Sequence, residues 1–109
     1  MLPPKDVYSA VIHNHTGKEV TVHLTYTNSM VNKLIRHTLV IPPGGQAAAE
    51  QRTFKEGATE FTTVITSVQV EGVTTKLMAP FPHVDSPTKD YPINIVEKNG
   101  AIEVQGKSV

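Results

Sequence analysis

The chain has 109 residues, enough for one domain with one modest hydrophobic core. Ten basic side chains balance ten acidic ones, so the broad positive field that favours nucleic-acid binding is absent. No basic run or amphipathic helix indicates a membrane partner, and the lack of cysteine excludes disulfides, thiolate metal sites and a cysteine nucleophile.

The same features favour a cytoplasmic location. A small secreted domain often depends on disulfides, and this chain has none. The first residues show no basic start followed by an apolar run, so no signal peptide is predicted. We expect one domain over residues 1–109, with residues 1–6 as an N-terminal tail.

The composition predicts an all-β fold. Thr, Val and Ile together supply 34 residues, against only five Leu. β-Branched side chains lose rotamer freedom in helices and pack well on sheets.

Residues 20–27 give the clearest strand signal, because apolar and polar residues alternate with a period of two. This pattern predicts one face in the core and one in water. The predicted core residues are Val20, Val22, Leu24 and Tyr26, and the predicted outer residues are Thr21, His23, Thr25 and Thr27.

A strand over residues 7–14 precedes this one, with a turn at residues 14–18 between them. A three-residue loop with Gly17 in the left-handed region predicts a hairpin. Its register keeps apolar residues opposite one another. The expected pairs are Ile12 with Val20, Ala10 with Val22, and Tyr8 with Leu24.

Further strands are expected between strong turn signals, of which Pro42-Pro43-Gly44-Gly45 is the firmest. Asn99-Gly100 predicts a tight hairpin between the last two strands. The expected segments are residues 34–41, 46–54 (as an edge strand), 59–70, 73–79, 93–97 and 101–105.

Residues 59–70 are expected to form one long strand with both faces apolar. Val64, Val68 and Val70 share one predicted face, and Phe61 and Ile65 the other. About eight short strands at regular spacing predict a single-domain antiparallel β-sandwich, immunoglobulin-like in the broad sense, with a Greek-key element.

The first candidate binding site is the loop at residues 80–92, which holds four of the eight prolines. Long loops in small domains are often functional. Phe81 and Tyr91 are predicted interface anchors, with His83 and Ser86 between them. The alternative is a crossover between sheets in which Phe81 caps the core.

A metal site is the second candidate. On a strand, His13 and His15 point to the same face, a geometry that metal ions use. With Glu19 they resemble the first metal-binding motif of the cupins, which are small metal-binding β-barrels. The resemblance implies a metal-binding protein or metalloenzyme with His13, His15 and Glu19 as ligands. The histidine of the second cupin motif is missing, because Gln46 follows the Pro-Gly-Gly turn.

Three weaker candidates remain. The threonine-rich outer face of residues 20–27 is suited to contact a protein or glycan, although threonine also simply suits strands. The Ala47–Ala49 segment is a candidate edge for pairing between copies. Asn14-His15-Thr16 fits the N-glycosylation pattern.

Catalysis has little support in the sequence. The nucleophile elbow, the phosphate-binding glycine loop and the dinucleotide fingerprint are all absent. A triad of Ser86, His83 and Asp85 would be crowded into one loop without a rigid scaffold. We therefore expect a non-enzymatic binding or adaptor module without a cofactor, whose partner is another protein reached through a loop or a sheet edge.

Overall fold

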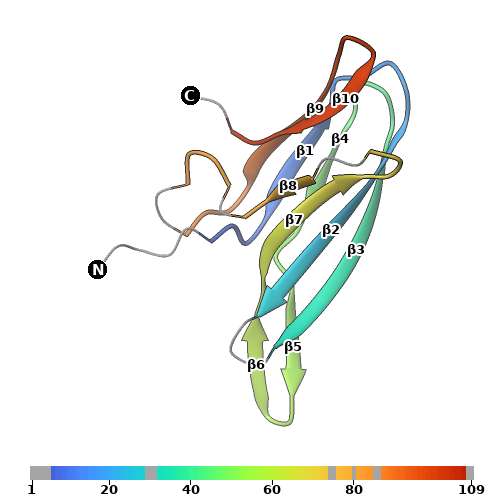
Figure 1. Cartoon of the computed structure of the whole chain (residues 1–109). Coiled ribbons are helices and arrows are strands. Elements are labelled where there is room, and N and C mark those ends of the chain that lie inside the picture. The colour runs from blue at the N-terminus through green and yellow to red at the C-terminus, as the bar shows by residue number, and fades with distance from the viewer. Residues whose placement is uncertain (1–5, 29–31, 74–75, 80, 85–86, 108–109) are drawn as a thin grey trace.

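A computed structural model describes residues 6–28, 32–73, 76–79, 81–84 and 87–107 (Figure 1). The chain is all-β, as predicted, and its sheets are open rather than closed into barrels. The described residues include no helix long and apolar enough to cross a membrane. Their strands are β1 (Ala10–Asn14), β2 (Val20–Asn28), β3 (Lys33–Ile41), β4 (Gln46–Ala49), β5 (Thr53–Glu56), β6 (Thr59–Thr62), β7 (Val64–Val70), β8 (Lys76–Met78), β9 (Tyr91–Lys98) and β10 (Ala101–Gln105).

Eight of these strands form two four-stranded sheets. The first sheet has the order β10-β9-β1-β4, and the second sheet has the order β3-β2-β7-β8. Buried apolar residues from both sheets make one core cluster. The remaining hairpin, β5–β6, projects from one end of the two sheets (Figure 1).

Strand β2 has the two faces that its alternation predicts. Val20, Val22, Leu24 and Tyr26 are buried, and the residues between them are partly exposed on the outer face of the second sheet. The Tyr26 hydroxyl donates to the Glu50 carbonyl oxygen at 2.9 Å, so the ring is buried without an unpaired polar group. Burial raises the pKa of this hydroxyl, although the nearby Arg52 partly offsets the effect.

The predicted hairpin between the first two strands is wrong, because β1 and β2 lie in different sheets. Strand β1 pairs with β4 on one side and with β9 on the other, so neither edge is left for β2. The turn is built around the Asn14 side chain, which is buried. The chain there crosses between sheets instead of closing a hairpin.

The first sheet is not purely antiparallel, which corrects a second prediction. Strand β1 runs parallel to β9, with Ile12 opposite Ile93. The two strands are far apart in the sequence, so no tight turn dictates their relative direction. The other strand pairs within the sheets are antiparallel.

The segment before β1 is fixed by main-chain hydrogen bonds although it is not a continuous strand. The Val7 carbonyl accepts from the Ile65 N–H at 2.8 Å, and Tyr8 N–H donates to the Thr88 carbonyl at 2.8 Å. Val7 is buried. Of the predicted tail, residues 1–5 lie outside the described residues, and Asp6 accepts a bond from Thr88 N–H at 2.9 Å.

The predicted long strand over residues 59–70 is divided in two at Thr63. Strand β6 pairs with β5, and β7 pairs with β2 and β8. An irregularity in the β2–β7 register lies opposite Thr25 and Tyr26. At this point β7 has one more residue than β2, because Thr25 pairs with Ser67 and the next residue, Tyr26, pairs with Ile65. The extra residue turns Ile65 to the same buried side as Val68 and Val70, so the predicted assignment of faces in this strand is wrong.

Two turn-based predictions have different outcomes. The Asn99-Gly100 hairpin is confirmed: both residues have positive φ, 53° and 79°, and β9 pairs with β10 around them. The segment at residues 46–54 is not one strand. It gives β4, which is an edge of the first sheet, and then the start of the β5–β6 hairpin, where the rings of Phe54 and Phe61 stack with centroids 5.4 Å apart.

Candidate functional site

The two aromatic residues of the 80–92 loop belong to the core. Phe81 is 3% exposed and Tyr91 is fully buried, and their rings stack with centroids 5.6 Å apart. The Tyr91 hydroxyl donates to the Pro82 carbonyl at 2.6 Å and accepts from Lys107 N–H at 2.8 Å. Burial raises the pKa of Tyr91, while the bond from Lys107 acts in the opposite direction. Neither ring is free to anchor a partner, which corrects the interface role predicted for both.

The other site residues predicted in this loop are His83 and Ser86. His83 is exposed and has a positive φ of 59°. Ser86 and Asp85 lie outside the described residues, so the structure gives no account of them. The loop is a connection fixed to the core by Phe81, Val84 and Tyr91.

His13 and His15 do lie on the same face, as their spacing predicts. Their rings stack with centroids 5.8 Å apart, and His15 Nε2 is 2.8 Å from Asn94 Oδ1. Glu19 is exposed on the turn that follows. Within the described part of the chain, no three His, Cys, Asp or Glu side chains are grouped so as to hold a metal ion.

The Asn-x-Thr pattern at Asn14 has a structural role. The Asn14 Nδ2 group donates to the carbonyls of Lys18, Ile41 and Pro42 at 2.8, 3.0 and 3.1 Å. Its Oδ1 accepts from the Thr16 N–H and hydroxyl. In the folded chain this amide is buried and fully engaged, so it is not available for glycosylation.

A groove lies on the outer face of the second sheet, away from the core. Its volume is about 280 Å³. The side chains that matter for its chemistry are His23, Thr25, Arg36, Thr38, Ser67 and Lys76. The groove thus holds two basic side chains and three hydroxyls. The part of it that β2 forms is the outer face that the alternation predicts.

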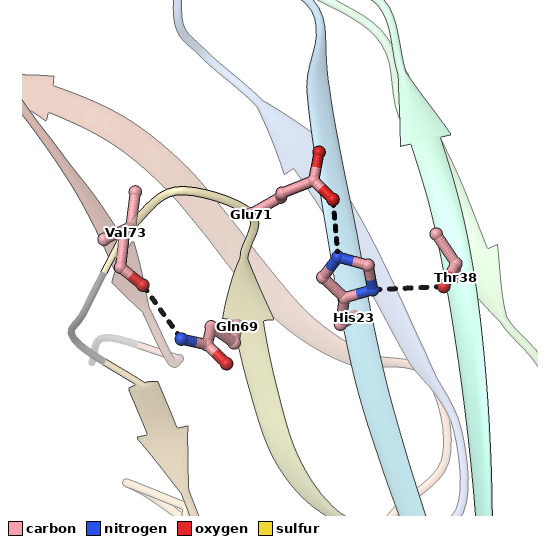
Figure 2. Close-up of polar contacts among 5 residues, drawn as sticks. All are labelled: His23, Thr38, Gln69, Glu71 and Val73. Atoms are coloured by element: carbon pink, nitrogen blue, oxygen red, sulfur yellow. Dashed lines mark hydrogen bonds and ion pairs between the residues drawn. The ribbon is translucent and has the colours of Figure 1, made fainter.

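His23 is fixed in this groove by two neighbours (Figure 2). Its Nε2 lies 3.3 Å from Glu71 Oε1, and its Nδ1 lies 3.1 Å from Thr38 Oγ1. A carboxylate only accepts, so Nε2–H donates to Glu71, and Nδ1 forms the second hydrogen bond with the Thr38 hydroxyl. On the adjacent strand Gln69 Nε2 donates to the Val73 carbonyl at 2.9 Å, which turns this amide away from His23.

The charge of the second sheet differs from that of the whole chain. Its four strands contain Lys33, Arg36 and Lys76 but no Asp or Glu. The Glu71 carboxylate, just after β7, contacts His23. Among the described residues no ion pair involves Arg36 or Lys76. The outer face therefore has a local excess of positive charge on a molecule whose net charge is zero.

Strand β3 is one edge of this sheet. It pairs with β2 over nine consecutive positions and is the last strand on that side. Its outer side chains are exposed, including Leu34 at 53% and Val40 at 57%. A nine-residue edge strand is long, since proteins commonly shorten or cover such edges.

The register shows which main-chain groups of β3 face outward. Glu71 N–H donates to the Thr21 carbonyl, so Thr21 and His23 direct their main-chain groups toward β7. The alternate β2 residues then face β3, and they pair with the odd-numbered residues of β3. The main-chain groups directed to the free edge are therefore those of Leu34, Arg36, Thr38 and Val40. None of these four has a main-chain bond outside the sheet ladders among the described residues.

The sequence predicts the outer position of His23 and Thr25 but does not predict that Arg36, Thr38, Ser67 and Lys76 lie beside them. These residues come from three strands that meet only through long-range pairing. The sequence places the candidate edge at Ala47–Ala49 and does not predict the free edge of β3, which depends on the order in which the strands pair. Comparison of the chain with protein-family models, curated proteins and solved structures gives no match.

Proposed function

We propose that this chain is a small, non-enzymatic β-sandwich module, immunoglobulin-like in the broad sense, that binds another protein. The observation that carries the proposal is the free edge of β3. It presents four outward main-chain N–H and C=O pairs beside two exposed apolar side chains, Leu34 and Val40. An extended segment of a partner would add to the second sheet as a further strand.

This mode of binding uses interactions that the edge already offers. Main-chain hydrogen bonds give affinity in strand addition, and the alternating side chains give specificity. The strand is held in place from behind, because Ile35 and Leu39 pack against the core. A partner strand would therefore meet a rigid edge and would not have to order it first.

A display library of random nonapeptides, selected on the immobilised protein, tests this proposal. Thr38→Pro removes one outward N–H from the middle of the edge without removing a main-chain bond to β2; like the control, it also loses the hydroxyl that contacts His23. Thr38→Val is the matched control, because it keeps the N–H and the branched shape. Thermal melting checks that both variants fold.

We expect enriched peptides to bind wild type and Thr38→Val alike and to bind Thr38→Pro at least about tenfold more weakly, since a lost main-chain bond also leaves the peptide carbonyl unpaired. Selection that yields no binding peptide, or peptides that bind Thr38→Pro as tightly as wild type, would overturn the proposal.

A further inference from the structure

We infer that the strand which binds β3 is acidic: it places an Asp or Glu side chain opposite Arg36 and apolar side chains opposite Leu34 and Val40. This inference rests on the proposed function and adds the chemistry of the partner to it.

The positions follow from the geometry of β3. The side chains of Leu34, Arg36, Thr38 and Val40 all lie on the outer face, because residues two apart on a strand share a face. These are also the residues whose main-chain groups face the free edge. Residues of an added strand that lie opposite them therefore direct their side chains to the same outer face.

The kind of side chain expected on the partner follows from the surroundings of each outer residue of β3. Leu34 and Val40 are more than half exposed, so an apolar residue opposite either one removes apolar surface from water. Arg36 has no ion-pair partner among the described residues, and no strand of its sheet carries a carboxylate. A carboxylate opposite Arg36 supplies the missing charge. Read along the partner, the pattern is apolar, acidic, variable and apolar at every second position, or the reverse.

A second copy of this chain fits the same edge less well. Two antiparallel β3 strands centred on His37 would place Leu34 opposite Val40, which is favourable, and Arg36 opposite Thr38. The two Arg36 side chains would then be diagonal neighbours on one face. The second sheet of each copy has no carboxylate on its strands that could lie between them. Arg36 thus opposes self-pairing and favours an acidic partner.

Selection of the same nonapeptide library on three immobilised proteins tests the inference: wild type, Arg36→Glu and Lys76→Glu. Arg36 is exposed, so its replacement leaves the core unchanged. Lys76 is the matched control, because it too lines the groove without an ion pair among the described residues, and it lies on β8, at the opposite edge of the sheet.

We expect wild type and Lys76→Glu to select peptides with one Asp or Glu between two apolar positions, and Arg36→Glu to select Lys or Arg at that position. For one selected peptide, changing its acid to the neutral amide should weaken binding to wild type by about 1.4-fold to fivefold, the usual range for an opposite-charge cross-strand pair, and should not weaken binding to Arg36→Glu.

The outcomes separate the two proposals. If Arg36→Glu selects the same acidic peptides as wild type, the inference about the acid is wrong and strand addition stands. If no bait selects any peptide, both fail. Sedimentation at high concentration is expected to give a monomer, and a dimer that dissociates in Thr38→Pro would show that a second copy occupies the edge and would overturn the acidic partner.

Discussion

Replacing Asn14 by Ala is expected to destabilise the fold far more than removal of a typical hydrogen-bonding side chain. Asn14 is 1% exposed and makes hydrogen bonds through both ends of its amide. It joins the turn after β1 to the carbonyls of Ile41 and Pro42 at the end of β3. The variant therefore removes side-chain hydrogen bonds that connect the two sheets at this end of the molecule.

The size of the loss follows from the groups that are left buried. Without Asn14 Oδ1, the Thr16 N–H loses its acceptor, whereas the Thr16 hydroxyl has the Lys18 carbonyl as a second acceptor within reach. Without Nδ2, the Ile41 carbonyl loses a buried donor. The unpaired Thr16 N–H costs about 1–3 kcal/mol. The lost bond to Ile41, which stays paired with Val20 in the β2–β3 ladder, costs about 1 kcal/mol, so we expect a loss of about 2–4 kcal/mol in the free energy of unfolding. That is a large part of the roughly 5–15 kcal/mol typical of a domain.

Urea denaturation measures this loss directly, and Asn94→Ala is the control. The Asn94 amide contacts His15 Nε2 at an exposed position, so its removal should cost less than about 0.5 kcal/mol. Asn14→Asp keeps the acceptor for Thr16 but directs a carboxylate at carbonyl oxygens, and it should destabilise at neutral pH at least as much as Asn14→Ala. Equal, small effects for Asn14→Ala and Asn94→Ala would refute this account of the turn.

Three further predictions concern Tyr91, Gly106 and His37. Tyr91→Phe removes the bonds to Pro82 and Lys107 and should lower the free energy of unfolding by about 1–3 kcal/mol, measured in urea; an unchanged value would contradict it. Gly106→Ala places a methyl group against the Tyr91 hydroxyl and 2.6 Å from Pro82 Cγ, so thermal melting should show a loss of about 1–3 kcal/mol in the free energy of unfolding. Gly17→Ala is the control, because Gly17 has open space around it, and it should change the stability little. Burial, with a smaller contribution from Arg52, lowers the pKa of His37 below its ordinary value of 6.5. Below pH 6.5 the unfolded chain therefore binds a proton that the folded chain does not, and acidification destabilises the fold. His37→Gln should reduce this loss of stability on acidification from pH 6.5. Identical pH profiles for His37→Gln and wild type would contradict that direction.

The sequence predicts well what is set by neighbouring residues. The period-two alternation of β2 identifies its buried and outer faces, because one face of a strand must meet the core. Asn99-Gly100 identifies a hairpin, because both residues tolerate positive φ.

What the sequence does not predict depends on long-range pairing. The Asn14 side chain organises a crossover where an ordinary loop of similar length would close a hairpin. The irregular register opposite Thr25 and Tyr26 reverses the faces of one end of β7, and no residue type marks it. The parallel pairing of β1 with β9 joins two segments that no turn connects.

The candidate site shows the same division. The outer position of His23 and Thr25 follows from the local alternation. Arg36 and Lys76 lie in the same groove only because β3, β2, β7 and β8 pair in that order. Charge counted over the whole chain is neutral, and the excess of positive charge on the second sheet appears only when the strands are sorted into sheets.

Amide hydrogen exchange along β3, measured by NMR with and without a peptide selected from the library, tests the free edge most directly. In the free protein we expect fast exchange at Leu34, Arg36, Thr38 and Val40 and slow exchange at the residues between them, because only the latter donate to β2. The selected peptide should slow exchange at Arg36 and Thr38. Slow exchange at all four outward amides in the free protein, or no change at Arg36 and Thr38 when the peptide is bound, would contradict strand addition at this edge.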